Sequence, residues 1–421
     1  MTDAAAPLDA LPAAGPVARG NVARVAVATV LTAVCGYAVL YLAARALDPA
    51  QFSVFGVFWG AFGLFTGAAN GLLQEATREV RSAGRPVAPG AADTRPMAVA
   101  AGVGAAAAVA IAGTSPLWAA HLFTDATALS VALLAVGVGG FCLHSTLLGM
   151  LAGVGRWAHY GSLMVTDAVI RVALAATTFV IGWGLVGFLW ATVAGAVAWV
   201  GLLAISPAVR AAARLRTAGT ASAFLRGAVH SIAAAGASAV LVMGFPVLLK
   251  ATSGDLGAAG GVVILAVTLT RAPLLVPLTA MQGNLIAYFV DRAVAHGTRL
   301  RALLIPTVIV VSVGAVGVLA AALVGPWLMQ AAFGPEYQTG GALLAWLTVG
   351  AVSVALLTLT GAATVAAALH RAYSFGWVGA TVAAAALLTL PLDLQTRTVI
   401  ALLCGPLVGI AVHTAALARS G

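Results

Sequence analysis

The segment from 127 to 153, TALSVALLAVGVGGFCLHSTLLGMLAG, contains no Asp, Glu, Lys or Arg. A helix needs about 20 apolar residues to cross the hydrocarbon core of a bilayer, so this run is long enough to span one. Eleven further apolar runs fill most of the chain: 22–46, 51–73, 96–115, 160–182, 184–206, 227–250, 257–287, 302–325, 340–367, 373–392 and 397–418. The sequence therefore predicts an all-α polytopic membrane protein with twelve transmembrane helices.

The composition of the whole chain supports this class. Of the 421 residues, 62% are hydrophobic and 8% are charged, and the mean hydropathy is +1.06. A water-soluble globule cannot bury that much apolar surface, and disordered chains are poor in hydrophobic residues. Cys35, Cys142 and Cys404 lie in separate apolar runs without metal-ligand spacing, so we expect them to be packing residues. No cofactor and no metal site is expected.

The basic residues predict the orientation in the membrane, because cytoplasmic loops of membrane proteins are rich in Lys and Arg. With the N-terminus inside, sixteen of the 21 basic residues are cytoplasmic, and only Arg45, Lys250 and Arg397 are outside. We therefore expect a multi-pass protein of a bacterial inner (plasma) membrane with both termini in the cytoplasm. The net charge of +9 then reflects topology and contact with anionic membrane lipids. No basic patch is interleaved with aromatic residues, so nucleic acid is not an expected partner.

The two halves of the chain carry an internal repeat. NGLLQEATREV at 70–80 aligns with NLIAYFVDRAV at 284–294, at an offset of 214, and GRWAHYG at 155–161 aligns with HRAYSFG at 370–376, at an offset of 215. Repeated halves are common in transporters. The repeat predicts a disordered leader at 1–21, a six-helix lobe at 22–206, a basic linker at 207–226 and a second six-helix lobe at 227–421. Each lobe has an even number of spans, so a pseudo-two-fold axis along the membrane normal relates the two.

Five segments with loosely spaced Gly, Tyr and Arg carry a family resemblance. They are LDPAQFSVFGVFW (47–59), GLLQEATREV (71–80), GMLAGVGRWAHYG (149–161), AAFGPEYQTGGALLAWLTVG (331–350) and AALHRAYSFGWVG (367–379). They resemble the polysaccharide flippases of the multidrug/oligosaccharidyl-lipid/polysaccharide exporter superfamily. The resemblance implies two lobes that face a central cavity and work by alternating access. It also implies that a polyprenyl-(pyro)phosphate-linked oligosaccharide, or a related cell-envelope glycolipid precursor, moves from the inner to the outer leaflet, with membrane lipids and glycan-assembly enzymes as further partners.

Two other functions are open at this point. An ion-coupled multidrug/cation antiporter of the same superfamily would use an acidic residue within a span. The first span has no carboxylate between Arg24 and Arg45, which leaves Asp167 as the candidate. A glycan polymerase or transferase would need catalytic residues in a large outer loop, whereas the predicted outer loops are short. We therefore expect a transporter and not an enzyme, with no catalytic residue.

Ionisable groups within a bilayer are functional candidates because they are costly to bury. Arg271 lies in LTRAPLLVPLT, just before Pro273 and Pro277, which we expect to kink or interrupt its helix. Its planar guanidinium suits a phosphate or pyrophosphate, although it could instead satisfy carbonyl groups freed by the prolines. Asp167 and Arg171 are four residues apart on one helix face. They are either a self-neutralising structural pair or a substrate or gating contact.

A polar stripe recurs at the cytoplasmic ends of the second and eighth spans. Its members at i, i+4 and i+8 are Asn70, Gln74 and Arg78 in the first lobe and Asn284, Tyr288 and Arg292 in the second. The recurrence favours two walls of one inward-facing vestibule, with Arg24 at the mouth of the first span. Interhelical hydrogen bonding is the alternative for the two asparagines. We expect His144 and His413 to be core histidines.

Overall fold

The computed structural model describes residues 19–82, 93–296 and 299–420, so most of the leader predicted at 1–21 lies outside the described residues. The elements of the N-terminal half are α1 (Arg19–Ala46), α2 (Pro49–Ser82), β1 (Asp93–Thr94), α3 (Pro96–Leu122), α4 (Thr127–Gly153), α5 (Trp157–Ile181), α6 (Gly184–Ala194), η2 (Gly195–Val197), α7 (Ala198–Ile205), α8 (Pro207–Ala213) and β2 (Thr217–Ala218).

The C-terminal half follows after β2 without a long connection. Its elements are α9 (Ala221–Val242), α10 (Phe245–Thr252), α11 (Gly257–Ala280), α12 (Gln282–His296), α13 (Arg299–Ala302), α14 (Leu304–Leu323), α15 (Gly325–Phe333), η3 (Pro335–Tyr337), α16 (Gly341–Ala366), α17 (His370–Leu388) and α18 (Leu394–Arg419). The repeat is visible in these bounds, since α16 begins 214 residues after α4.

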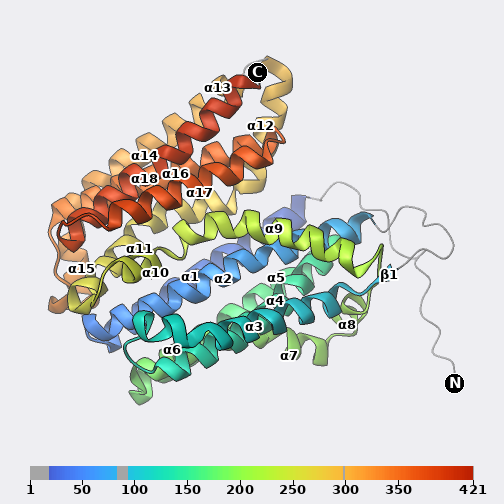
Figure 1. The fold of residues 1–421 in the computed structure, drawn as a ribbon, viewed down its shortest axis with the longest axis horizontal. Helices are drawn as coiled ribbons and strands as arrows, with labels where there is room; N and C mark the ends of the chain where they lie inside the picture. The colour runs from blue at the N-terminus through green and yellow to red at the C-terminus, as the bar shows by residue number, and fades with distance from the viewer. Residues whose placement is uncertain (1–18, 83–92, 297–298, 421) are drawn as a thin grey trace.

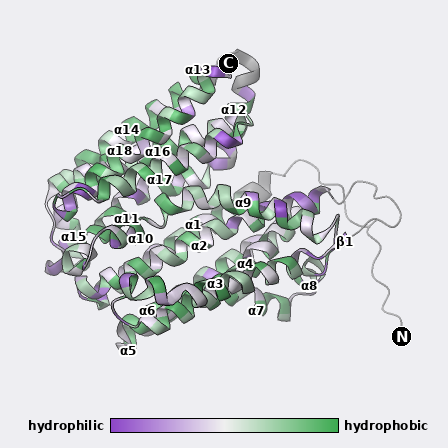
Figure 2. Cartoon of the chain, in the orientation of Figure 1, coloured by the Kyte–Doolittle hydropathy of each residue, from purple (hydrophilic) through white to green (hydrophobic). Residues whose placement is uncertain are grey.

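Within the described residues, eleven helices are long and apolar enough to cross a membrane. The one predicted span that is not among those eleven is 373–392, which corresponds to α17; this helix starts with the polar residues His370 and Arg371. It nevertheless lies alongside α18 for most of its length (Figure 1). Figure 2 shows hydrophobic residues along the helices and hydrophilic ones concentrated towards helix ends, as expected for helices that are solvated by lipid.

The helices form two groups, as the repeat predicts. In Figure 1, α1–α8 form the lower group and α12–α18 the upper group, and the two groups meet at the left and diverge towards the right. The diverging ends carry Arg78, Arg156, Arg210 and Arg371, and we call this side the arginine-rich end. The side where the groups meet, with the loops after α1 and α15, is called the opposite end.

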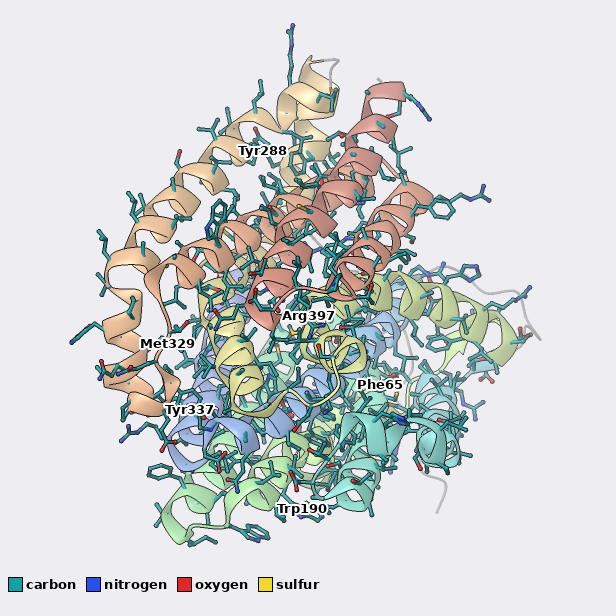
Figure 3. All side chains as sticks on the ribbon, turned by 60° about the vertical axis from the view of Figure 1, so that its left-hand side comes forward. Phe65, Trp190, Tyr288, Met329, Tyr337 and Arg397 are labelled. Carbon is teal, nitrogen blue, oxygen red and sulfur yellow. The ribbon has the colours of Figure 1, made fainter. Side chains whose placement is uncertain are left out.

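Aromatic residues from both halves pack together at the opposite end. The ring centroids of Tyr41 on α1 and Phe333 on α15 are 5.7 Å apart. Tyr337 is fully buried there, and Figure 3 shows it between α15 and the helices of the N-terminal half. The two halves are therefore joined at the opposite end and separate towards the arginine-rich end.

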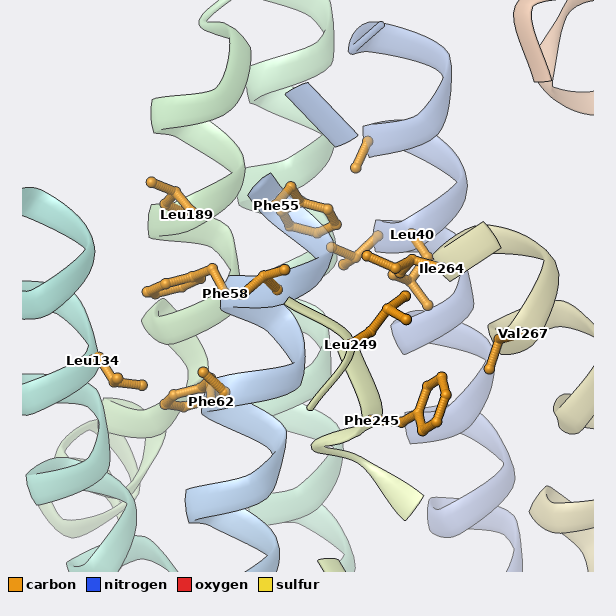
Figure 4. Close-up of a cluster of buried hydrophobic side chains, with 14 of the residues drawn as sticks. Leu40, Phe55, Phe58, Phe62, Leu134, Leu189, Phe245, Leu249, Ile264 and Val267 are labelled. Carbon is orange, nitrogen blue, oxygen red and sulfur yellow. The ribbon is translucent and has the colours of Figure 1, made fainter. Parts of the chain in front are cut away.

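The buried core continues from this contact towards the middle of the molecule. Figure 4 shows Phe55, Phe58 and Phe62 of α2 beside side chains from α10 and α11, among them Leu249 and Ile264. Gly56 on α2 makes the approach possible, because a Cβ there would lie 2.7 Å from the Cγ2 atom of Ile264. Helix α2 is therefore the element on which the C-terminal half rests.

Several predicted spans have different bounds in the structure; the one predicted at 96–115 continues to Leu122 as α3, and the one at 184–206 is divided into α6, η2 and α7. The span predicted at 51–73 continues to Ser82 as α2. The span predicted at 227–250 is divided into α9 and α10, and the one predicted at 257–287 ends at Ala280, before α12 begins. Of the kink or interruption expected at Pro273 and Pro277, the interruption is not found, since α11 runs through both. Prolines are tolerated in membrane helices where neighbouring groups satisfy the freed backbone.

Candidate functional site

Arg271 is buried where α11 crosses the junction of α9 and α10. Arg271 is only 6% exposed. Its Nη1 atom donates hydrogen bonds of 3.3 Å to the carbonyl oxygens of Leu241 and Val242 at the end of α9. The guanidinium carbon lies 5.0 Å from the centre of the Phe245 ring, the first residue of α10. Arg271, which lies on α11, therefore contacts both α9 and α10, the two parts of a broken helix.

The break in that helix follows from Pro246. A continuous helix would need the backbone N–H of residue 246 to donate to the carbonyl of Val242, and proline has no N–H. The carbonyls at the end of α9 are thus without helical partners and carry the partial negative charge of a helix C-terminus. An arginine supplies hydrogen-bond donors to these carbonyls and a positive charge that offsets their partial negative charge. Of the two carbonyls that Arg271 meets, that of Val242 is freed by a proline, which lies in a neighbouring helix and not in its own.

Two of the donor atoms of Arg271 are not used in this arrangement. Nε and Nη2 are buried and make no hydrogen bond among the described residues. No carboxylate among those residues pairs with Arg271. Tyr37 on α1 lies close enough to interact with it electrostatically. A buried, unpaired cation with free donors costs free energy, so this position is suited to an anionic ligand that supplies oxygen acceptors.

Asp167 and Arg171 form an ion pair on α5, as their spacing predicts. Arg171 Nη2 donates to Asp167 Oδ1 at 2.9 Å, and Nε donates to both carboxylate oxygens at 3.1 Å. The remaining nitrogen, Nη1, donates to the carbonyl oxygen of Thr192 at 2.6 Å. The side chain of Arg171 is 13% exposed and that of Asp167 is 11% exposed. All three nitrogens of Arg171 are therefore occupied, which supports the structural interpretation of the pair.

The backbone of η2 packs directly against this ion pair at Gly195. A Cβ at residue 195 would lie 2.2 Å from Asp167 Oδ1, so only glycine fits in the 3-10 turn η2. The Arg171 guanidinium also lies over the Phe62 ring at 5.2 Å. His144 on α4 is buried nearby, stacked on Phe141 with ring centroids 5.2 Å apart, and its Nδ1 has no partner among the described residues.

His413 on α18 is the buried histidine of the other half. Its Nδ1 is 3.0 Å from Thr360 Oγ1, and its Nε2 is 3.2 Å from the carbonyl oxygen of Tyr373. Both ring nitrogens are satisfied, so His413 behaves as a core residue.

The polar stripe on α2 has a buried member that the i, i+4, i+8 pattern does not include. Asn70, Gln74 and Arg78 are exposed, and Ser145 Oγ donates to Asn70 Oδ1 at 3.3 Å. Glu75 is only 2% exposed, and Arg78 Nε donates to its Oε2 at 3.1 Å. The Glu–Arg spacing of three residues is a signal for such a pair.

The equivalent stripe lies on α12. Asn284 is exposed, and Tyr288 is half-buried against Phe289, with ring centroids 5.4 Å apart. The side chain of Arg292 lies outside the described residues. Arg24 is exposed on α1. The α2 stripe and the α12 stripe lie on groups of helices that diverge at this end (Figure 1).

Comparison with solved structures identifies the fold. An inward-facing multidrug resistance MATE family transporter of the MOP superfamily matches with a TM-score of 0.72 at 14% identity, covering 94% of this chain and 98% of that one. An outward-facing conformation of a multidrug resistance MATE family transporter matches with a TM-score of 0.62 at 15% identity, covering 95% of this chain and 96% of that one. A MOP superfamily transporter from Pyrococcus furiosus matches with 0.63 at 15% identity and the same coverage. The chain therefore has the two-lobed, MATE-like transporter fold of a multi-pass membrane protein.

Comparison with curated proteins identifies close relatives. No protein-family model matches the chain. The uncharacterized protein Rv3630 of Mycobacterium tuberculosis strain H37Rv is 67% identical over 99% of this chain and 97% of its own length. A second protein of that strain, Rv1510, is 66% identical over 96% of this chain and 93% of its own length. The chain belongs to the same family as these mycobacterial proteins.

Proposed function

We propose that the protein is a transporter that moves a polyprenyl-(pyro)phosphate-linked oligosaccharide, or a related cell-envelope glycolipid precursor, from the inner to the outer leaflet by alternating access. The MATE-like fold supports transport, because its relatives are solved in inward-facing and outward-facing states. The arginine-rich end is placed in the cytoplasm, following the positive-inside rule. The lipid-linked glycan then binds from the end where the two groups of helices diverge.

The observation that carries the proposal is the buried Arg271 with its two unused donors. Nε and Nη2 form one edge of the planar guanidinium, and that edge matches two oxygens of a phosphate. Nη1 stays bonded to the end of α9, which fixes the orientation of the fork. In this proposal the pyrophosphate binds Arg271, the polyprenyl tail stays in lipid, and the exposed polar residues of α2 and α12 contact the glycan.

A multidrug/cation antiporter is the second candidate, because the inward-facing transporter with a matching fold is a multidrug resistance protein. Such a mechanism needs a carboxylate that is free to exchange a cation or proton. The buried carboxylates among the described residues are Asp167 and Glu75. Both are ion-paired, with Arg171 and Arg78 respectively. The glycolipid precursor is therefore the better-supported substrate. Drug resistance that requires Asp167 would favour the antiporter.

The first experiment identifies the substrate. The protein is depleted in its host, intact cells are treated with a membrane-impermeant glycan-cleaving enzyme added outside, and the lipid-linked glycans are then extracted and analysed for cleavage. We expect one polyprenyl-linked glycan to accumulate on the cytoplasmic side. If no such intermediate accumulates, the protein is not a flippase for this class of substrate.

The second experiment tests the assigned residue in the same assay. Arg271→Ala should abolish export, and Arg271→Lys should impair it strongly because an ammonium lacks the planar fork. Arg371→Lys is the matched control, since Arg371 is exposed at the start of α17. Normal export by both Arg271 variants would show that the anion is not bound there.

A further inference from the structure

Helix α9 belongs to the C-terminal half in the repeat, but it packs closely on α2 of the N-terminal half. A Cβ at Gly71 would lie 2.2 Å from the backbone nitrogen of Ile232, and one at Gly67 would lie 2.7 Å from the Cβ of Ala239. Backbones approach this closely in membranes only where one helix presents small residues. These two close approaches span about one turn of α2 and about two turns of α9.

The contact continues to the arginine-rich end, where the remainder of the C-terminal half diverges. There the carboxylate of Glu75 on α2 lies against Gly227 in the second turn of α9, and a Cβ at that glycine would be 1.9 Å from Oε1. Arg78 neutralises this carboxylate from the solvent side. In Figure 1, α9 follows α2 at this end, while α12 and α18 lie far from it.

The chain that leads into α9 is also attached to the N-terminal half. Strand β2 pairs antiparallel with β1, so Thr94 lies opposite Thr217. Arg216 Nη1 is 2.7 Å from Asp93 Oδ2, and Thr94 Oγ1 donates to the carbonyl oxygen of Gly219 at 2.8 Å. Thr220 then caps α9. No free length of linker separates α9 from the N-terminal half.

The other end of α9 is where regular structure stops. Helix α9 ends at Val242, and α10 begins at Phe245, so Met243 and Gly244 form a two-residue break. Helix α9 contacts its own half through the Arg271 hydrogen bonds, through Val242, which packs in a cluster with Leu275 of α11 and Val354 of α16, and through α17, where Tyr373 meets Ser238. A short break between two rigid helices is a common form of hinge.

We propose that α9 moves with the N-terminal six helices, and that Met243–Gly244 is the hinge about which the remainder of the C-terminal half rocks. The moving bodies are then residues 19–242 and 245–420, and not the two halves of the repeat. Arg271 lies across the boundary, with its Nη1 on the α9 side of the hinge. If the proposed function holds, an anion on Nε and Nη2 therefore binds at the seam between the moving bodies; the hinge itself does not depend on that function.

The test measures distances between spin labels on exposed positions at the arginine-rich end, in the full-length protein with Cys35, Cys142 and Cys404 replaced by alanine. One pair, Ser82→Cys with Arg226→Cys, joins α2 to α9, and the other, Arg226→Cys with Arg419→Cys, joins α9 to α18. Each pair is measured with the native opposite end and with two variants that weaken its closure, Tyr337→Ala and Gly56→Trp. Gly56→Trp is included so that the opposite end is opened by a second route if Tyr337→Ala alone does not increase the open population.

We expect the α9–α18 distance to shorten when the opposite end opens, while the α2–α9 distance stays within its original distribution. If the α2–α9 distance changes as much as the α9–α18 distance, α9 moves with its own half and the proposal is wrong. If the α9–α18 distance is constant in both variants, the hinge does not move and the proposal is equally wrong. No substrate enters this measurement, so a failure of the glycan export assay leaves its result unaffected.

Discussion

The hydroxyl of Tyr337 donates a 3.0 Å hydrogen bond to the carbonyl oxygen of Leu47. Leu47 follows α1 and Tyr337 ends η3, so this bond joins the two halves at the opposite end. The Tyr337 ring lies edge-on to Phe52, with centroids 5.9 Å apart. Burial raises the pKa of Tyr337, and the charges of Asp48 and Glu336 raise it further, so the hydroxyl stays protonated and keeps donating. In the proposed alternating-access cycle, this contact breaks whenever the opposite end opens.

Tyr337→Phe removes the hydrogen bond but keeps the ring, and should favour the state in which the opposite end is open. A hydrogen bond contributes about 0.5–1.5 kcal/mol net, so we expect the open population to rise by up to roughly tenfold. A cysteine at Leu40, which is buried beside α11, reports the opening through its modification rate by a membrane-impermeant maleimide. Tyr41→Phe is the control, since it removes a hydroxyl from the same aromatic group. Equal rates in the two variants would mean that the bond does not hold the end closed.

Breaking the Asp167–Arg171 pair should destabilise the fold. Removing one partner of a buried ion pair typically costs about 3–5 kcal/mol, because the other charge is left unpaired. Asp167→Asn should therefore lower the thermal unfolding midpoint in detergent clearly. The double variant Asp167→Asn/Arg171→Gln should recover part of the loss, because no charge is then left. A loss in the double variant equal to the sum of the two single losses would contradict this account of the pair.

Gly71→Ala should destabilise the contact between α2 and α9. The added methyl group would overlap the backbone of Ser231 and Ile232, which cannot move away as a side chain can. Overpacking of this kind costs about 1–3 kcal/mol. The matched control is Gly36→Ala on α1, where a Cβ meets nothing within 4 Å. Thermal unfolding in detergent checks the prediction, and equal midpoints for the two variants would contradict it.

The start of α18 should loosen in acid through Asp393. Its carboxylate accepts a hydrogen bond of 3.0 Å from the backbone N–H of Thr396, and hydrogen bonding to Thr396 lowers the pKa of Asp393 below its usual value. A carboxyl whose pKa is lower in the folded state stabilises that state above its unfolded pKa, near pH 4, and loses this contribution as the pH falls through the folded value.

Amide exchange in the first turn of α18 should therefore accelerate below about pH 4 relative to the intrinsic rate. Asp393→Asn keeps a capping oxygen but does not titrate, so its protection should not change with pH over this range. The same acid-dependent loss of protection in the Asn variant would assign the effect to another group.

Much of this architecture is predictable from the spacing of apolar residues. The run at 127–153 coincides with α4, and the repeat offset reappears in the start of α16. The reason is that a helix in lipid must be apolar along its whole length, so the pattern is strong. Glu75 does not stand out in that pattern, because it lies beyond the predicted end of its span. Its burial depends on α9, whose packing on α2 is a tertiary contact.

The span predicted at 227–250, which is broken into α9 and α10, is a feature that the spacing of apolar residues does not predict. Pro246 divides it, whereas Pro273 and Pro277 leave α11 continuous. Proline content alone therefore predicts the wrong helix. What decides the outcome is which freed carbonyl finds a donor, and here the donor is Arg271 from a separate helix. The sequence does identify Arg271 as an unusual charge, but not the end of α9 as its partner.

Pro246→Ala should repair the break between α9 and α10. The new N–H at residue 246 would be able to donate to the carbonyl of Val242, which would then be shared with Arg271. One added hydrogen bond of about 1 kcal/mol should slow amide exchange across residues 243–248 by roughly fivefold. Pro273→Ala is the control, because its helix is already continuous. Unchanged exchange in Pro246→Ala would mean that the break does not depend on proline, and the explanation of why Arg271 meets free carbonyls would have to be abandoned.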